Sequence, residues 1–248
     1  MINLLKSKFL EYDIPFEEDV SLKKKTWIKT GGFVSLWVAP TTLELLKKAV
    51  ELLSRFNVNF ELVGHTSNIY YLDDYNPKVI LSTINVKHFK ESEDFIDCEC
   101  GTSVTTLSRY CVEKGYVGYY GLVNLPGTVG AAVCNNSSCF NCSISEHILE
   151  AIFFDLDKKK IVCLNFNDFN FSYRNSKLKC KELNGVLLSI KLDKKQGEVQ
   201  VEKTKAAEVT YIRSATQNSP AFTLGSVYAG LTPKNDLLAI MARGGVNC

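Results

Sequence analysis

Long apolar runs are missing from this chain of 248 residues. No stretch approaches the roughly 20 apolar residues of a membrane-spanning helix, and the N-terminus has neither a long apolar segment nor a small-residue cleavage site. A dominant charge is also missing, because 29 Lys and Arg stand against 27 Asp and Glu, for a net charge of +2. We therefore expect a cytoplasmic protein with no nucleic-acid or membrane partner. The sequence leaves the oligomeric state open.

Histidine is scarce, with three residues, whereas cysteine is frequent, with nine. Cys139-Phe-Asn-Cys142 is a single C-x-x-C pair without a second pair and without a His at ligand spacing, so the sequence predicts no metal site. Several other cysteines stand in apolar patterns, which favours buried, reduced thiols. A redox or disulfide role for Cys139 and Cys142 stays open.

The stretch from Leu122 to Asn136 is unlike ordinary core sequence. Pro126-Gly127 is a turn dipeptide inside an apolar run, and Gly130 and Ala131 leave the backbone nearly bare. The run ends in short amide and hydroxyl side chains. A bare backbone beside such groups suits a planar ligand with polar edges, such as a flavin ring. The alternative is a glycine-rich turn between a helix and a strand.

A second polar turn, Gly64-His-Thr-Ser-Asn68, follows a segment that alternates like a strand and precedes Ile69. Backbone N–H groups gathered in such a turn can bind phosphate without a lysine. The alternatives are a plain polar turn and, for His65, a loop side chain satisfied by solvent. Because cofactor sites favour interfaces, we expect residues 64–68 and 126–131 to come together around one extended dinucleotide.

The remaining pattern predicts an α+β protein. Residues 1–25 read as a short helix and a charged connector. Helical spacing and capping signals predict helices at residues 41–55, with a capping box from Thr41 to Glu44, and at 103–114, 201–213 and 235–243. Strands are predicted at residues 34–38, 57–63, 79–82, 95–99 and 186–192, with a hairpin of 144–155 and 161–166. We expect a small lobe (1–75), a larger lobe (76–200) and a remainder (201–248).

Gly64, Ser67 and Asn68 match the Gly-Gly-Gly-Ser-Asn-Leu-Leu segment of the UDP-N-acetylenolpyruvoylglucosamine reductase (UDP-N-acetylmuramate dehydrogenase) family. Three further motifs resemble those of this family. Leu125-Pro-Gly-Thr-Val-Gly-Ala-Ala-Val133, followed by Asn136, is similar to its Ile-Pro-Gly-Thr-Val-Gly-Gly-Ala-Val…Asn signature. Phe169 to Ser176 resembles Cys-x-Phe-x-Tyr-Arg-Asp-Ser, and Leu224 to Tyr228 resembles Ala-Gly-Ser-Val-Phe. The resemblance implies a two-lobed FAD-binding fold of the vanillyl-alcohol-oxidase-like (PCMH) type, with residues 201–248 as the remnant of a truncated third, substrate-binding domain.

The same resemblance implies an FAD-dependent oxidoreductase of peptidoglycan precursor synthesis. NADPH would donate electrons, and the substrate would be a UDP-sugar, UDP-N-acetylglucosamine enolpyruvate, reduced to UDP-N-acetylmuramate. Arg174 would face the enolpyruvyl group and Ser226 would donate a proton. The residues expected at the cofactor are Gly64, His65, Thr66, Ser67, Asn68, Ile69, Gly101, Asn124, Pro126, Gly127, Thr128, Gly130, Ala131, Asn136 and Tyr173.

The chain departs from the family pattern at several positions. His65 and Thr66 stand where glycines are usual, and Ala229-Gly-Leu replaces Lys-Asn-Pro after the third motif. No residue matches the family's late glutamate, which assists proton transfer. Two alternatives follow: a flavoprotein oxidase or dehydrogenase acting on another sugar nucleotide or small substrate, and a catalytically inactive flavin-binding relative.

Overall fold

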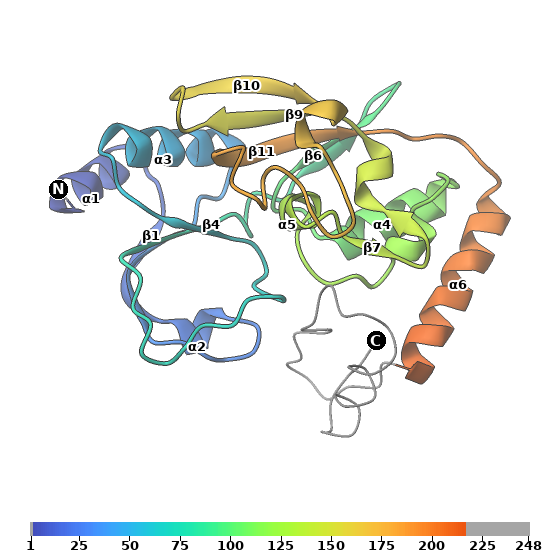
Figure 1. Cartoon of the computed structure of the whole chain (residues 1–248), viewed down its shortest axis with the longest axis horizontal. Helices are drawn as coiled ribbons and strands as arrows, with labels where there is room; N and C mark the ends of the chain where they lie inside the picture. Colours follow the sequence, from blue (N-terminus) through green and yellow to red (C-terminus); the bar gives the residue numbers. More distant parts are fainter. Residues whose placement is uncertain (1, 217–248) are drawn as a thin grey trace.

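The computed structural model describes residues 2–216, which form two β-sheets with helices packed between and around them (Figure 1). One sheet has four strands in the order β1-β2-β4-β3, and the other has five in the order β10-β9-β11-β6-β5. A two-stranded hairpin, β7-β8, is separate from both. The mixture of helices and sheets is the α+β class that the sequence predicts.

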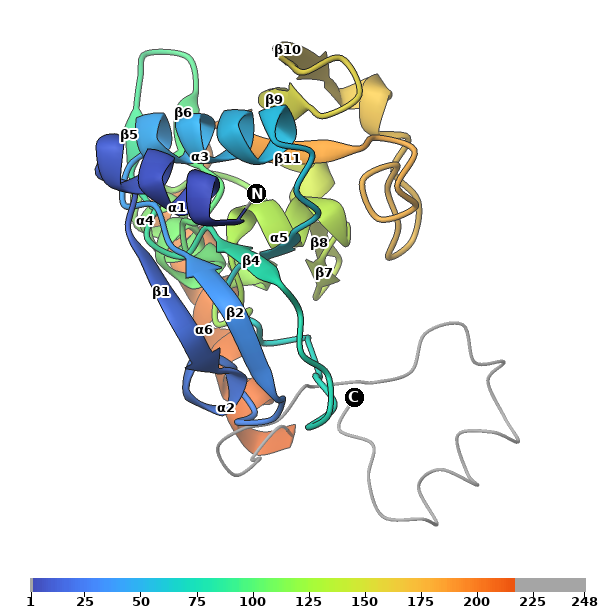
Figure 2. The ribbon, with the colours of Figure 1, turned by 90° about the vertical axis from the view of Figure 1, so that its left-hand side faces the viewer.

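The four-stranded sheet is built from β1 (Phe16–Ser21), β2 (Phe33–Val38), β3 (Glu61–Val63) and β4 (Val79–Ser82). β4 pairs in parallel with both β2 and β3, while β1 is antiparallel to β2 (Figure 2). The charged connector expected up to residue 25 was wrong here, because it contains β1 and the short helix α2 (Leu22–Lys25). β1 is an edge strand with one well-buried side chain, Val20, so its apolar signal is weak and its pairing with β2 defines it.

Helix α3 (Leu43–Arg55) joins the two sheets. Its buried residues Leu46, Val50 and Leu53 follow the helical spacing that the sequence predicts. They belong to one cluster with β2 and β4 on one side and β9 and β11 on the other. The expected capping box at Thr41 was wrong by one residue, because the Oγ1 atom of Thr42 accepts the hydrogen bond from Leu45 N, at 3.2 Å.

The five-stranded sheet is antiparallel throughout and contains the predicted hairpin. Its strands are β5 (Phe89–Glu91), β6 (Ile96–Glu99), β9 (Ile148–Asp155), β10 (Lys160–Asn165) and β11 (Gly185–Leu192). The hairpin is shorter than expected, since residues 144–147 form a 3-10 turn, η2 (Ile144–His147). Strand β5 lies within a charged segment for which the sequence predicted no strand.

The helix end signals predicted at residues 103 and 115 are confirmed. α4 (Val104–Lys114) begins after Ser103, whose side chain caps Thr106 N, and ends at Gly115 with φ +78°. The other elements are α1 (Ile2–Glu11), η1 (Tyr120–Leu122), α5 (Val129–Cys134), β7 (Ser138–Cys139), β8 (Cys142–Ser143), η3 (Phe166–Phe169) and α6 (Val199–Thr216). α6 packs on α4 and η1.

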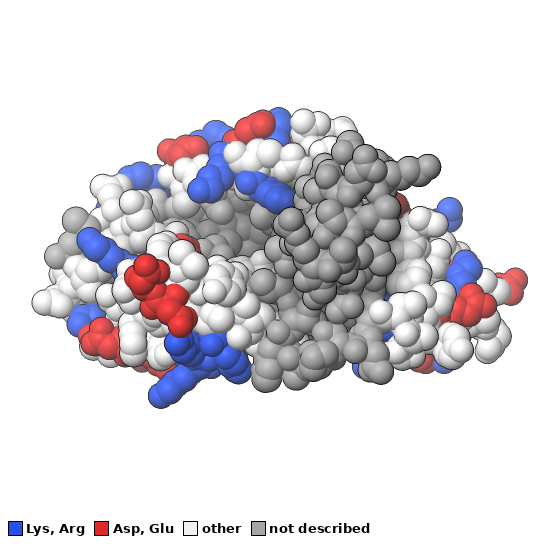
Figure 3. Space-filling model, turned by 60° about the horizontal axis from the view of Figure 1, so that its bottom comes forward, with Lys and Arg blue, Asp and Glu red and all other residues white. Residues whose placement is uncertain are grey.

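The sheets also bear on the expected lobe boundary. β4 lies beyond residue 75 yet pairs within the four-stranded sheet, so that sheet extends at least to Ser82. The helix predicted at residues 235–243 lies outside the described residues. None of the described helices has the length and apolar character that crossing a membrane requires. Acidic and basic side chains are interspersed on the face shown in Figure 3.

Candidate functional site

The two polar turns singled out in the sequence are in contact in the structure. A Cβ atom placed on Gly64 would lie 2.3 Å from the Oγ1 atom of Thr128, and one placed on Gly127 would lie 3.5 Å from the Oγ atom of Ser67. Only glycine at position 64 permits this approach. The predicted convergence of residues 64–68 and 126–131 is confirmed. We call these two segments together the cradle.

A third segment, residues 100–104, is bonded to the cradle. Gly130 N donates to Cys100 O at 2.7 Å, Val129 N to Thr102 O at 2.8 Å, and Val104 N to Gly127 O at 3.1 Å. These bonds fix residues 127–130 at the end of β6. Thr128 also caps α5, because its Oγ1 atom accepts a hydrogen bond from Ala131 N at 3.4 Å.

Gly101 was expected at the cofactor, and in the structure it packs closely against the backbone of Thr83. A Cβ atom there would lie 1.9 Å from Thr83 O, and Gly101 N already donates to Val86 O at 2.8 Å. Its N–H group is therefore engaged by the protein. The glycine allows the chain after β4 to pass close to the end of β6.

Thr66 shows how the turn is made without its usual glycine. Its φ of +54° lies in the left-handed region that favours glycine. The side chain is 4% exposed, and its Oγ1 atom accepts a hydrogen bond from Trp27 N at 2.8 Å. This bond from a distant segment holds the turn. Ile69 closes it, because its N–H group donates to Thr66 O at 3.2 Å.

The turn presents free backbone donors. Within residues 2–216, the N–H groups of His65, Thr66, Ser67 and Asn68 donate to no protein acceptor. Consecutive N–H groups without a protein acceptor are the donors that an anion-binding nest uses. His65 is half-buried, and its pKa is lowered, first because burial disfavours the imidazolium and second because Lys87 is nearby.

Asn136 positions the next segment of the site. Its Nδ2 atom donates to Ser172 O at 2.8 Å, and its Oδ1 atom accepts from the Oγ atom of Ser143 at 2.8 Å. Ser172 and Asn175 exchange backbone hydrogen bonds, both at 3.1 Å. Asn136 therefore braces a tight turn whose two central residues are Tyr173 and Arg174.

That turn exposes Tyr173 and leaves Arg174 partly buried. Tyr173 is 81% exposed, and the guanidinium carbon of Arg174 lies 5.9 Å from the centre of the Tyr173 ring. Arg174 has φ +55°, a conformation that costs a residue other than glycine about 1 kcal/mol. In the described part of the chain, the only interaction of its guanidinium is this stacking on Tyr173. Strain of this kind is often found at functional sites.

Asn124 was also expected at the cofactor, but its side chain binds elsewhere. Its Oδ1 atom accepts from Nη2 of Arg109 at 2.5 Å, and its Nδ2 atom donates to the Oγ1 atom of Thr210 on α6 at 3.1 Å. The residue thus ties the start of the cradle segment to α4 and α6. Ser226, the expected proton donor, lies outside the described residues.

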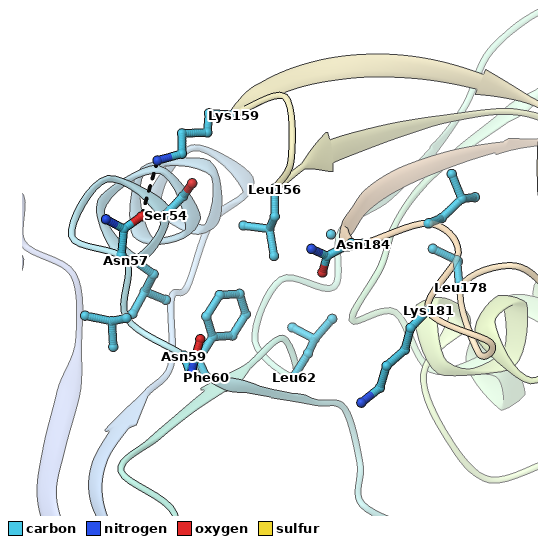
Figure 4. A pocket seen from close by; sticks show the side chains of 14 residues that line it. Ser54, Asn57, Asn59, Phe60, Leu62, Leu156, Lys159, Leu178, Lys181 and Asn184 are labelled. Carbon is cyan, nitrogen blue, oxygen red and sulfur yellow. Dashed lines mark hydrogen bonds between the residues drawn. The ribbon is translucent and has the colours of Figure 1, made fainter.

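A pocket of about 540 Å³ opens between the two sheets, and the sequence analysis missed it. Apolar side chains, including Phe60, Leu62 and Leu156, line it, together with asparagine amides and two lysines (Figure 4). Nζ of Lys159 donates to the Oδ1 atom of Asn57 across its rim, at 3.3 Å. The walls come from segments far apart in the chain, so no local motif marks them. Leu62 is two residues from Gly64, so the pocket adjoins the cradle.

Comparisons with known proteins agree with this geometry. The family model described as an FAD binding domain matches residues 34–161. The UDP-N-acetylenolpyruvoylglucosamine reductases of Caldicellulosiruptor saccharolyticus and Petrotoga mobilis are both 30% identical to this chain. The first aligns with 87% of this chain and 69% of its own length, and the second with 87% and 71%.

Solved structures show the same fold. The reductase of that name from Thermus caldophilus superimposes with a TM-score of 0.74 at 21% identity, covering 93% of this chain and 80% of its own. A chitooligosaccharide oxidase superimposes with a TM-score of 0.56 at 12% identity, and the match covers 76% of this chain and 42% of the oxidase. The expected FAD-binding fold of the vanillyl-alcohol-oxidase-like type is confirmed. Sequence and fold together show that this chain belongs to the UDP-N-acetylenolpyruvoylglucosamine reductase family.

Proposed function

We propose that the protein is an FAD-dependent oxidoreductase that reduces UDP-N-acetylglucosamine enolpyruvate to UDP-N-acetylmuramate, a step of peptidoglycan precursor synthesis, with NADPH as the electron donor. The observation that carries the proposal is the contact between residues 64–68 and 126–131 in a chain of this family. The contact places four free N–H donors beside a backbone that has almost no side chains. Such a surface fits a dinucleotide.

The cradle would hold FAD through the main chain. The N–H groups of residues 65–68 would bind the pyrophosphate, and the bare backbone at Gly127, Gly130 and Ala131 would lie against the flavin ring. Pro126, exposed beside them, would border the same surface. When bound, FAD supplies the hydride chemistry, while the protein orients the reactants and excludes water.

The pocket beside Leu62 would take the adenosine half of FAD. Its volume of about 540 Å³ lies within the ordinary range for ligand pockets. Its apolar walls suit a planar base, and the amides of Asn57, Asn59 and Asn184 can bond to the base and ribose. Lys159 and Lys181 add positive charge at the rim. An extended dinucleotide would then reach from this pocket to α5.

Arg174 would act on the substrate. Its guanidinium can bond two oxygens of a carboxylate in parallel, and among the described residues it meets no carboxylate of this protein. Set on a turn that Asn136 braces, it would hold the carboxylate of the enolpyruvyl group and stabilise the negative charge that develops there. Ser226 would supply a proton to the neighbouring carbon.

The visible spectrum of the purified protein tests the cofactor. We expect bound FAD, bleaching on addition of NADPH, and recovery of the absorbance when UDP-N-acetylglucosamine enolpyruvate is added. A colourless protein that does not bind added FAD would refute the proposal. Arg174→Lys should retain FAD but lose about 10²- to 10³-fold in turnover. Arg55→Lys, on an exposed side chain at the end of α3, is the matched control and should change nothing.

A second candidate, reduction or oxidation of a different sugar nucleotide, is favoured by one feature of the sequence. Ala229-Gly-Leu stands where the family has Lys-Asn-Pro. NADPH bleaching without recovery by the enolpyruvate would support it. The third candidate, an inactive relative, is motivated by His65 and Thr66 in the pyrophosphate turn. Thr66 adopts the left-handed conformation that the turn requires, so its part of that motivation is weakened, and a melting temperature that added FAD does not raise would support this candidate.

A further inference from the structure

A short hairpin beyond the cradle carries two cysteines face to face. β7 and β8 pair so that Cys139 lies opposite Cys142. The turn residues Phe140 and Asn141 have φ +48° and +58°, as in a two-residue type I′ turn. Opposed residues in antiparallel strands have Cα atoms about 4.5–5.5 Å apart, within the range that a disulfide accepts. Both thiols are free, so the register of the hairpin leaves them available to bond to each other.

Arg213 of α6 contacts the first of these sulfurs. Its Nη2 atom donates to Sγ of Cys139 at 3.0 Å, and its Nη1 atom donates to Asn124 O at 2.7 Å. Its Nε atom is buried and, within residues 2–216, has no hydrogen-bond partner. A guanidinium donor stabilises negative charge on the sulfur that it contacts. Cys139 is therefore placed to act as the attacking sulfur and as the leaving sulfur in the reverse reaction.

Cys142 has the complementary environment. Its side chain is 2% exposed and packs on Gly121, where an added Cβ atom would lie 2.8 Å from Sγ. Burial raises the pKa of the Cys142 thiol. It is thus protected from direct attack by small reagents but lies next to Cys139. This asymmetry, with one partly buried cysteine beside a cation and one buried cysteine, is that of a nucleophilic and a resolving cysteine.

We propose that Cys139 and Cys142 form a redox-active dithiol that exchanges with low-molecular-weight disulfides, independently of the flavin chemistry. The Cys139 thiolate attacks one sulfur of the small disulfide, whose S–S bond breaks and releases one thiolate. Cys142 then loses its proton and attacks the Cys139 sulfur of the mixed disulfide, which releases the second thiolate. The released thiolates take up the two protons of the dithiol. One small disulfide is reduced to two thiols, and the hairpin dithiol is oxidised to an intramolecular disulfide.

The test uses the full chain, fully reduced, with oxidised glutathione as the probe. Peptide mapping by mass spectrometry should find Cys139 joined to Cys142, reversible by dithiothreitol. The Cys142→Ser variant should instead retain one glutathionyl group on Cys139, and Cys139→Ser should leave the hairpin unmodified. A wild-type chain with glutathione on Cys139 and no internal bond would overturn the proposal. So would modification confined to the exposed Cys163 and Cys180.

The role of Arg213 is tested by the rate of thiol alkylation at neutral pH. Arg213→Gln shortens the side chain and removes its charge, so the hydrogen bond to Sγ of Cys139 is lost and alkylation of Cys139 should slow by roughly tenfold. Exposed Cys163 on β10 is the reference within the same molecule and should react at the same rate in both proteins. An unchanged Cys139 rate would overturn the assignment of Cys139 as the activated sulfur.

Discussion

Replacing Gly64 by alanine tests the contact on which the cofactor site depends. The new Cβ atom would lie 2.3 Å from the Oγ1 atom of Thr128 and 2.9 Å from its Cγ2 atom. An ordinary contact requires about 3.4 Å or more, so the two segments must separate by roughly 1 Å. Overpacking of this kind costs about 1–3 kcal/mol. Because the cradle must close on the ligand, we expect FAD affinity to fall by roughly 5- to 150-fold.

The chain offers a matched rescue. Thr128→Ala removes Oγ1 and Cγ2, the two atoms closest to a Cβ atom at position 64, but leaves the Cβ atom of residue 128 at 3.1 Å from it. The double variant Gly64→Ala/Thr128→Ala should therefore recover part of the FAD affinity. Thr128→Ser in the Gly64→Ala background removes Cγ2 but keeps Oγ1, the atom in closest contact, and should recover less. Thr128→Ala alone loses the cap on Ala131 N and should cost about 1 kcal/mol of stability.

Flavin fluorescence titration of the parent and the four variants gives the affinities, and circular dichroism checks that each protein is folded. A Gly64→Ala protein that binds FAD as tightly as the parent would refute the reasoning. Equal rescue by Thr128→Ala and Thr128→Ser would also refute it, because Oγ1, the atom in closest contact with the new Cβ atom, is removed by alanine and kept by serine.

Three further predictions concern stability. The pKa of His65 is lower in the folded chain than in the unfolded chain, so below about pH 6.5 the unfolded chain binds a proton more readily than the folded chain does. The free energy of unfolding should therefore fall as the pH drops through about 6.5. Urea unfolding measured across this pH range should show that His65→Gln removes this part of the pH dependence. An equal change of unfolding free energy with pH in the parent and the variant would contradict the prediction. Gly115 has φ +78°, and a Cβ atom added there would lie 3.0 Å from Val199 N. Gly115→Ala should therefore cost about 1–2 kcal/mol of stability and lower Tm by a few degrees, while FAD affinity stays unchanged. An unchanged Tm would contradict this. Asn136→Asp loses the hydrogen bond that the side chain donates to Ser172 O and should cost about 1–3 kcal/mol of stability. Asn141→Asp, at an exposed position, should cost little. Equal urea midpoints for these two variants would contradict the prediction.

The family motifs and the helices could be read from the sequence because their signals are local. The spacing of Leu46, Val50 and Leu53 defines the buried face of α3 whatever it packs against. Ser103 and Gly115 mark the ends of α4 by satisfying groups within the same helix. The glycines at 64 and 127 likewise reveal a backbone that something must approach closely, although they do not say what approaches it.

Other features depended on partners far along the chain. Strand β1 exists because β2 lies beside it, and its own residues alternate poorly. Gly101 looked like a ligand contact, but its neighbour is Thr83. Asn124 looked like part of the cofactor site, but α6 takes its side chain. In each case the decisive neighbour comes from another segment, so no window of local sequence contains it.

By itself, the sequence determined the longer helices, the hairpin, the family and the two turns that form the cradle, because periodicity, capping and glycine placement act within a few residues. The tertiary structure alone decided how the turns meet at Gly64 and Thr128, how Trp27 holds Thr66, and that a pocket opens beside Leu62. It also decided that Arg213 reaches Cys139. These are contacts between surfaces brought together by packing, and their geometry is fixed only when the whole core has formed.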